Sequence, residues 1–184
     1  MSDRVAVFDV DGTLLLGDCL WMAARRARSP VAQVAACVAC VPQLIGWQLR
    51  LISTGQFKQR VMAAFGICEA VNHAAAMGQD PWLLDQLRTQ IRPLALLRLR
   101  EHQQQGDRVL LCSASPRPLL QPLADWLGVE LLCTELTQED GEWLPKLASL
   151  NCKGAQKVRR LEQHLGPLED LTIEAYGDSK GDRE

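Results

Sequence analysis

The sequence predicts an α/β fold, in which helices cover a doubly wound parallel sheet. Three observations carry this prediction. Short apolar runs at 4–9, 108–112 and 171–176 have the length and composition of strands. Helix-like segments separate the strands in the second half of the chain, and such alternation is typical of parallel sheets. A long helical block follows the first strand and interrupts the alternation.

The first half of the chain reads as one strand followed by helices. The run RVAVFD at 4–9 is a strand that enters a polar loop, DVDGT, and residues 17–28 are helix-like and end in arginines. The break at 53–55 starts a new series of helices. These are expected near 56–65, 69–77 and 82–91. The whole helical block, roughly 16–92, is therefore expected to form an insert on one side of the sheet.

The second half returns to alternation. A helix begins at Pro93 and stops at Gly106, before the strand at 108–112. The later expected elements are a helix at 117–127, a strand at 129–136, a β excursion around Gly141, a helix at 153–165 and a strand at 171–176. The predicted domains are a core made of residues 1–15 and 93–184 and a helical insert made of residues 16–92.

Composition limits the class of protein. The chain has 184 residues, of which 47% are apolar and 23% charged, which suits one domain with a modest insert and excludes a disordered chain. The net charge of -2 provides no general basic field, so nucleic-acid binding is not expected. The seven cysteines are irregularly spaced, and no secretory signal precedes them. We therefore expect reduced thiols and a cytoplasmic location.

Residues 29–49 contain no charged side chain and are rich in Ala, Val and Cys. Three interpretations apply: a buried helix of the insert, which is favoured, a contact with a membrane surface, or a wall that lines the substrate site. The segment is long enough to span a bilayer, and the arginines at 25, 26, 28 and 50 flank it as interfacial anchors do. Glutamines and Pro42 dilute its apolar character. The side chains of Cys37 and Cys40 are expected to be buried where this helix packs, because nothing nearby completes a redox or zinc site.

Polar clusters follow three of the predicted strands. They are Asp9 to Thr13, Ser113 to Ser115 and Asp178 to Asp182. Ligands of open α/β sheets bind at the carboxyl ends of the strands, so these clusters are expected to meet in one crevice. Lys153 and Lys157, near the start of a helix, are expected to face the same place.

This set of side chains suits phosphoryl transfer. A pair of carboxylates and a distant third one are typical ligands of Mg²⁺, which takes few protein oxygens and keeps waters and a phosphate oxygen. Two carboxylates two residues apart can act differently: one attacks phosphorus, and the other protonates the leaving oxygen and activates water. Gly12 allows close approach of the backbone to a ligand. Ser113 and a lysine would hold the phosphoryl oxygens.

Four motifs in this order resemble the haloacid dehalogenase (HAD) superfamily of phosphatases. They are FDVDGT at 8–13, LLCSAS at 110–115, NCKGAQKV at 151–158 and YGDSKGD at 176–182. The resemblance implies a HAD-like Rossmannoid parallel sheet with a helical cap inserted after the first strand. The insert and the SAS form look like subfamily IB, the phosphoserine phosphatase-like group. Within it the sequence is most similar to the phosphatidylglycerophosphatase C-like branch.

The resemblance also implies roles for individual residues. Asp9 would be the nucleophile that forms an aspartyl-phosphate, and Asp11 would be the general acid and base, with its backbone carbonyl on Mg²⁺. Asp9 and Asp178 would supply metal carboxylates, and Asp182 would orient the lysine or the water ligands of the metal. Ser113 would bind the phosphoryl group.

Two points of this assignment involve a choice. Lys157 matches the Gly-x-x-Lys form of the nearer branch and is favoured as the phosphate-binding lysine, while Lys153 matches an Asn-x-Lys-Gly form of phosphoserine phosphatases. Ser115 with Pro116 is interpreted as the start of the next helix. The loop residues expected to contact the substrate are Gly12, Thr13, Ala114 and Ser115.

The predicted function is a Mg²⁺-dependent phosphomonoester hydrolase acting on a small-molecule or lipid phosphate ester. The alternatives are a phosphatase for lipid phosphates at the membrane surface and an inactive phosphate-binding module. Members of the family usually continue beyond the fourth motif, whereas this sequence ends at Glu184. We therefore expect either a truncated C-terminus or a sheet with a bare edge.

Overall fold

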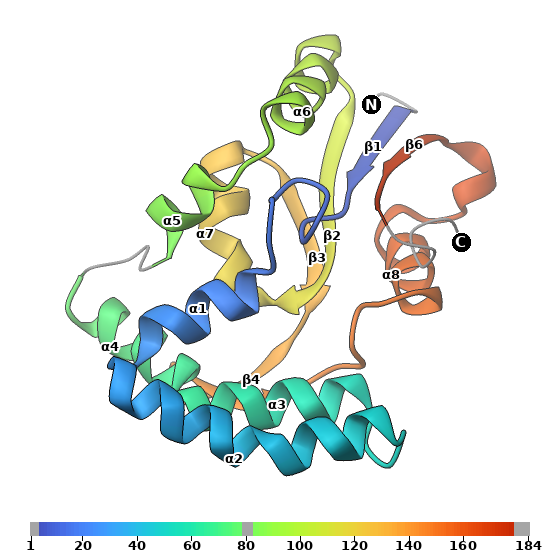
Figure 1. Ribbon diagram of the computed structural model, residues 1–184. Helices are drawn as coiled ribbons and strands as arrows, with labels where there is room; N and C mark the ends of the chain where they lie inside the picture. The colour runs from blue at the N-terminus through green and yellow to red at the C-terminus, as the bar shows by residue number, and fades with distance from the viewer. Residues whose placement is uncertain (1–3, 79–82, 179–184) are drawn as a thin grey trace.

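A computed structural model describes residues 4–78 and 83–178 and shows an α/β fold built on a parallel sheet (Figure 1). The strands are β1 (Arg4–Phe8), β2 (Arg108–Pro116), β3 (Glu130–Thr134) and β6 (Thr172–Tyr176). Their order is β3-β2-β1-β6, and every neighbouring pair is parallel. The predicted fold class is confirmed.

The register of the sheet aligns the ends of its strands. Phe8, the last residue of β1, pairs with Leu111 of β2 and with Tyr176, the last residue of β6. Because β1 lies between β2 and β6, the loop after β1 emerges at the centre of this edge. The segments that follow Phe8, Leu111 and Tyr176 are thus brought together.

Helices cover both faces of the sheet, as period-two alternation along the strands requires. Ala6, Phe8 and Leu111 belong to the larger core with α6 (Pro93–Gln105) and α7 (Arg117–Leu127). Val5, Val7, Leu110 and Cys112 form a smaller core on the other face. Leu161 and Leu165 of α8 (Ala155–Leu165) pack against that second core, and a 3₁₀ turn at Leu168–Asp170 leads from α8 into β6.

Between β1 and α6, the described residues form five helices. They are α1 (Cys19–Ala27), α2 (Pro30–Gln48), α3 (Thr54–Phe65), α4 (Ile67–Ala76) and α5 (Leu84–Thr89). The Asp18 carboxylate accepts a hydrogen bond from the Trp21 amide and caps α1. Ser53 and Gln56 form a capping box at the start of α3, and Gly66 ends that helix in the left-handed conformation. The domain limits at residues 15 and 93 remain a prediction.

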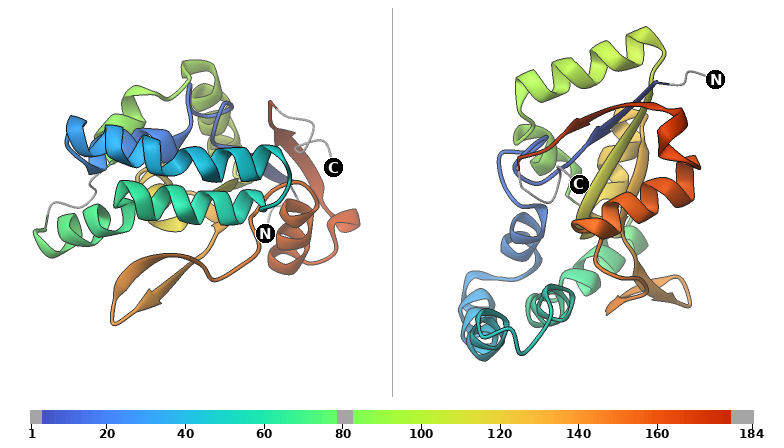
Figure 2. Two further views of the ribbon diagram at one scale, coloured as in Figure 1. Left: turned by 60° about the horizontal axis from the view of Figure 1, so that its bottom comes forward. Right: turned by 90° about the vertical axis from the view of Figure 1, so that its right-hand side faces the viewer.

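The prediction that residues 29–49 form a buried helix is correct for the helix but wrong for its burial. The helix α2 forms and continues through Pro42, but only Ala36 and Cys40 are buried in it. Cys37, which was expected to be packed, is exposed. Figure 2 (left) shows α2 lying alongside α3. The helix makes its inward contacts through small side chains and turns its bulky apolar ones outward.

The β excursion is an antiparallel hairpin of β4 (Leu136–Glu139) and β5 (Glu142–Leu147). It leaves the sheet and packs against the helical block. The Asn72 side chain of α4 donates to the Trp143 carbonyl (3.0 Å) and accepts from the Trp143 amide (2.9 Å). The Leu147 amide donates to the side-chain oxygen of Gln59 in α3 (2.8 Å). This hairpin therefore ties the helices to the second half of the chain.

Candidate active site

The three polar clusters meet at the carboxyl edge of the sheet. Asp9 follows β1 directly, and its amide donates to the Tyr176 carbonyl at 2.9 Å, which extends the pairing of β1 with β6 by one residue. Asp9, Asp11 and Asp178 line one cavity of about 300 Å³. The cavity lies between this edge and helices α1, α2 and α3, which contribute its other wall.

Gly12 makes the approach of Asp178 possible. The residue has φ +82°, and a Cβ atom at this position would lie 2.3 Å from an Oδ atom of Asp178. A side chain here would be strained by the backbone angle and would displace the carboxylate. Acids that are far apart in the sequence are therefore packed against one loop. Asp182 lies outside the described residues.

Asp9 forms an ion pair with Lys157. The Lys157 Nζ lies 2.7 Å from an Oδ of Asp9, and each side chain is only 12% exposed. Gly154, at φ +55°, precedes α8, which places Lys157 in the first turn of that helix. Lys153 precedes the helix and lines the same cavity. Of the two candidate lysines, Lys157 is thus the one that forms an ion pair with Asp9.

Asp11 is held by hydrogen bonds from three sides. One carboxylate oxygen accepts from the Cys19 amide at 2.8 Å. The other accepts from the Ser115 hydroxyl at 2.5 Å and lies 3.5 Å from the Ser113 hydroxyl. The Ser113 oxygen in turn accepts from the Ser115 amide at 3.0 Å. This network fixes the orientation of the Asp11 carboxylate.

Two expectations for the loop after β2 change in the structure. Helix α7 begins at Arg117, its N-cap position is Pro116, and no side chain caps it, so Ser115 is not a helix cap. Its hydroxyl contacts Asp11 instead, because β2 extends to Pro116. Ser113 is buried and is not among the residues that line the cavity, whereas Ala114 is.

Gly12 and Thr13 do not line the cavity either. The buried Thr13 hydroxyl has no hydrogen-bond partner within residues 4–78 and 83–178.

Lys58 is a site residue that sequence reasoning missed. It comes from α3, and its Nζ donates to the Ala114 carbonyl at 2.8 Å and to the Asn151 side-chain oxygen at 3.5 Å. Burial lowers the pKa of Lys58, although the nearby Asp11 acts in the opposite direction. The sequence feature that could have indicated this role is the position of Lys58 between two apolar residues, Phe57 and Val61, which both line the cavity.

Asp18 is the fourth carboxylate of the cavity. Burial raises the pKa of Asp18, and the negative charge of Asp11 adds to this effect. Asp18 also caps α1. The sequence analysis did not single it out, since its spacing from Asp11 matches no simple ligand pattern.

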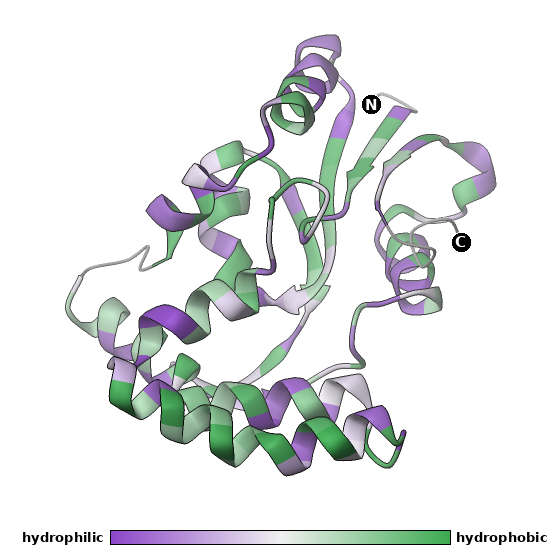
Figure 3. Cartoon of the chain, viewed as in Figure 1, coloured by the Kyte–Doolittle hydropathy of each residue, from purple (hydrophilic) through white to green (hydrophobic). Residues whose placement is uncertain are grey.

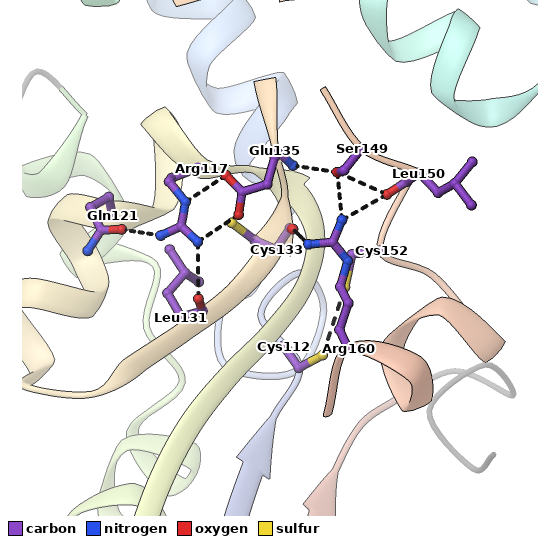
Figure 4. Close-up of polar contacts among 10 residues, drawn as sticks. All are labelled: Cys112, Arg117, Gln121, Leu131, Cys133, Glu135, Ser149, Leu150, Cys152 and Arg160. Atoms are coloured by element: carbon purple, nitrogen blue, oxygen red, sulfur yellow. Dashed lines mark hydrogen bonds and ion pairs between the residues drawn. The ribbon is translucent and has the colours of Figure 1, made fainter. Parts of the chain in front are cut away.

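A polar network holds the loop between β5 and α8, which carries Asn151 and Lys153. Its contacts to Ser149, Leu150 and Cys152 are drawn in Figure 4. Arg160 of α8 donates to the Cys133 carbonyl (2.6 Å), to the Ser149 hydroxyl (2.6 Å) and to the Leu150 carbonyl (3.1 Å). The Cys152 amide donates to the Thr134 hydroxyl at 3.0 Å. The Cys152 sulfur lies 3.9 Å from that of Cys112. The loop is thereby fixed to the ends of β2 and β3.

Helices α1, α2 and α3 contribute apolar side chains to the lining of the cavity. They include Leu20, Trp21, Trp47, Phe57 and Val61. The rings of Trp47 and Phe57 stack with centroids 5.4 Å apart, and the indole N–H of Trp47 donates to the Thr54 hydroxyl at 3.2 Å. The cavity is therefore lined by the acids of the sheet edge and by aromatic side chains of the helices, with Asp18 and Lys58 as charged groups on the helical side.

The chemistry of the donors fits Mg²⁺. Carboxylates of Asp9, Asp11 and Asp178 face one cavity, and Mg²⁺ characteristically takes one or two protein carboxylates and keeps several waters. Among the described residues, no group of three or more His, Cys, Asp or Glu is already gathered as a metal cage.

Comparisons with known proteins agree with this architecture. The model of the haloacid dehalogenase-like hydrolase family matches residues 6–184. Protein CicA of Caulobacter vibrioides (strain NA1000 / CB15N) is 32% identical over 190 aligned positions, which cover 98% of this chain and 80% of that protein.

Solved structures share the fold at lower identity. A protein of unknown function from Bordetella pertussis Tohama I superimposes with a TM-score of 0.71 at 23% identity, covering 95% of this chain and 80% of that one. A substrate-bound phosphoserine phosphatase superimposes with a TM-score of 0.57 at 14% identity, covering 94% and 77%. Given the match along nearly its whole length, the chain belongs to the haloacid dehalogenase-like hydrolase family.

Proposed function

We propose that this hydrolase is a Mg²⁺-dependent phosphatase that cleaves phosphomonoesters through an aspartyl-phosphate on Asp9. The observation that carries the proposal is the Asp9 carboxylate, ion-paired to Lys157 at 2.7 Å in a cavity that Asp11 and Asp178 also line. A carboxylate beside a lysine and further acids is suited to attack a phosphoryl group whose charge the lysine offsets.

The Asp9 oxygen attacks phosphorus, a new P–O bond forms, and the bond from phosphorus to the leaving oxygen breaks. Asp11, in its protonated form, gives its proton to that leaving oxygen. The Ser115 hydroxyl and the Cys19 amide hold the Asp11 carboxylate for this transfer. In the second half, Asp11 takes a proton from the water that attacks the phosphorus, and Asp9 is released with inorganic phosphate.

Lys157 and a metal would share the task of charge neutralisation. The Lys157 ammonium would bind a phosphoryl oxygen in place of part of its contact with Asp9. Bound Mg²⁺ would be held by Asp9, Asp178 and the backbone carbonyl of Asp11, with Asp182 supporting its water ligands, and would supply positive charge to the phosphoryl oxygens. Lys153 would remain a secondary cation at the rim of the cavity.

The substrate is proposed to be an ester with an apolar portion. The aromatic side chains of Trp21, Trp47 and Phe57 line the cavity together with the acids, which favours a lipid-like phosphate over a small polar one such as phosphoserine. Membership of subfamily IB and of its phosphatidylglycerophosphatase C-like branch, and a cytoplasmic location, remain predictions. The retained Asp9, Asp11 and Asp178 speak against an inactive phosphate-binding module.

Phosphate release from an aryl phosphate tests the proposal. The wild-type chain should turn over in the presence of Mg²⁺ and stop when EDTA removes the ion. Asp9→Asn keeps the shape of the side chain but removes the nucleophile, and should lower kcat by about 10⁴-fold or more. Turnover retained by Asp9→Asn would refute the mechanism, provided that its unfolding midpoint matches the wild type.

A substrate panel then separates the two classes of ester. Phosphoserine and a long-chain lipid phosphate are compared at equal concentration, each with and without detergent. The aromatic lining of the cavity predicts a higher kcat/KM for the lipid phosphate, and a preference for phosphoserine would contradict that part of the proposal.

A further inference from the structure

Helix α2 has its apolar surface on the side that faces away from the protein. Val31, Val34, Val38, Val41 and Ile45 recur at three- and four-residue spacing and thus lie on one face of the helix. They are between 51% and 82% exposed, whereas the buried residues of α2 are the small Ala36 and Cys40. A helix on the surface of a water-soluble domain normally has the reverse arrangement. Most of α2 is hydrophobic along its length (Figure 3).

The outer face of α2 continues into the turn that follows it. Leu49 is 64% exposed and Leu51 is 76% exposed. We name Val31, Val34, Val38, Val41, Ile45, Leu49 and Leu51 together the α2 face. Exposed apolar side chains this numerous and contiguous mark a binding surface rather than ordinary surface residues.

The stretch of sequence that contains the α2 face has charge of one sign, and Glu69, which shares a surface hollow with Arg26 and Arg28, lies just beyond it. No Asp or Glu occurs from Cys19 to Cys68, although the whole chain has net charge -2. Five exposed arginines lie in this stretch: Arg25, Arg26, Arg28, Arg50 and Arg60. The first three precede the helix and Arg50 follows it, so cations flank the apolar face at both ends. A second copy of this chain docking here would set like charges against each other, whereas an anionic lipid surface would satisfy both the apolar and the cationic groups.

We infer that the α2 face binds the surface of an anionic lipid bilayer, with the helix lying in the plane of the interface. The helix α2 is long and apolar enough to cross a membrane by length and composition alone. Its inner residues Ala36 and Cys40 pack into the protein, and α3 beside it carries Gln56, Lys58 and Arg60. If α2 spanned the bilayer, these polar side chains of α3 would lie in the hydrocarbon. The packing of α2 therefore supports attachment of the protein through the α2 face alone.

Helix α2 lies between this face and the cavity. Trp47, at the end of α2, is 38% exposed and lines the cavity with Asp9 and Asp11. It follows Ile45 by two residues, which places it on the opposite side of the helix from the α2 face. Binding to the surface itself does not rest on the proposed hydrolysis, because it is measured without turnover.

The test is sedimentation of the full chain with vesicles. One set contains phosphatidylcholine alone, and the other contains equal parts phosphatidylcholine and phosphatidylglycerol. We expect the protein to sediment with the mixed vesicles, to stay in solution with the neutral ones, and to dissociate as salt concentration rises. Equal sedimentation with both sets, or with neither, would overturn the inference.

Matched variants locate the binding face. Val34→Gln with Val38→Gln should lower the partition coefficient by about tenfold, because it removes apolar contacts from the middle of the face. Arg25→Gln with Arg50→Gln should weaken binding several-fold, on mixed vesicles only. The control, Leu94→Gln with Leu97→Gln, changes leucines that are 78% and 54% exposed on α6, at the opposite end of the molecule from α2 (Figures 1 and 2). This control should bind as the wild type does.

Two further results would contradict the inference. One is unchanged vesicle binding by the Val34→Gln and Val38→Gln variant with an unaltered unfolding midpoint. The other is a dimer in sedimentation velocity that this variant abolishes, since the face would then be an interface between copies of the chain.

Discussion

The carboxyl edge of the sheet and the outer face of α2 use their side chains in opposite ways. At the edge, Asp9, Asp11 and Ser115 are charged or polar, yet each is at least partly enclosed and makes short hydrogen bonds or ion pairs. On α2, Val31 and Val38 are apolar and yet exposed to solvent. Each region violates the usual distribution of polar and apolar groups. Such exceptions mark binding sites, because a bound partner pairs with the enclosed polar groups or covers the exposed apolar ones.

The largest effect expected beyond the nucleophile itself concerns the two lysines of the edge. Lys157→Ala should lower kcat for an aryl phosphate by about 10²- to 10³-fold, since it removes a cation aimed at developing negative charge. Lys153→Ala is the matched control and should cost less than about tenfold. The reverse order would show that Lys153 is the phosphate-binding lysine.

A core substitution sharpens the contrast in burial. Leu123 of α7 is fully buried, so Leu123→Ala should lower the free energy of unfolding by about 2 to 5 kcal/mol through lost burial and a cavity. Val38→Ala on α2 also removes apolar carbons but should change it by less than about 0.5 kcal/mol. Urea denaturation measures both. A large loss in Val38→Ala would mean that α2 is packed in solution.

Gly12 separates backbone strain from the position of Asp178. Gly12→Ala and Gly128→Ala both place a side chain at positive φ, +82° and +69°, and each should cost about 1 to 2 kcal/mol of stability. A Cβ at Gly128 meets nothing within 4 Å, whereas one at Gly12 meets the Asp178 carboxylate. Only Gly12→Ala should therefore raise the Mg²⁺ concentration needed for half-maximal activity. An equal effect of both variants on activity would contradict this role of the contact.

The smallest effect concerns Glu130, at the start of β3 and away from both regions. Hydrogen bonds from Arg108, at 2.5 and 2.7 Å, lower the pKa of Glu130 from 4.5 to about 2, and His164 contributes. The stabilisation is full above pH 4.5 and is lost as pH falls towards 2. Glu130→Gln should thus cost about 0.5 to 1 kcal/mol at pH 7, and the difference should shrink below pH 4.5.

Glu142→Gln, on the exposed first residue of β5, is the matched control for Glu130. Thermal unfolding of both variants between pH 7 and pH 3 gives the comparison. A Glu130→Gln difference that does not depend on pH would show that packing, and not the ion pair, is responsible.

The sequence predicted the parallel sheet because its strands are short apolar runs separated by helical periodicity, which are local features. It also predicted that Asp9, Asp11 and Asp178 meet, since strand ends share an edge in every parallel sheet. It did not predict Lys58, because a single lysine on a helix does not reveal which surface that helix will cover. Nor did it predict the role of Ser115, since the extension of β2 to Pro116 overrides a local helix-start pattern.

The segment 29–49 shows the same limit from the other side. Its composition correctly indicated a helix, and the interpretation as a buried one followed from its lack of charge. Burial depends on which neighbours pack against a helix, and in α2 only Ala36 and Cys40 are buried. The composition of a segment does not show how much of its surface its neighbours will cover.

The β4–β5 hairpin has a consequence for how molecules enter the cavity. The two linkers of the helical block are hydrogen-bonded to each other, from Leu16 to Gln90 and from Arg92 to Leu14. The hairpin is hydrogen-bonded to the block through Asn72 and Gln59. The helices are thus anchored at two separate places. A movement of the helices that widened the entrance to the cavity would therefore have to move the hairpin with them and bend the chain on either side of it.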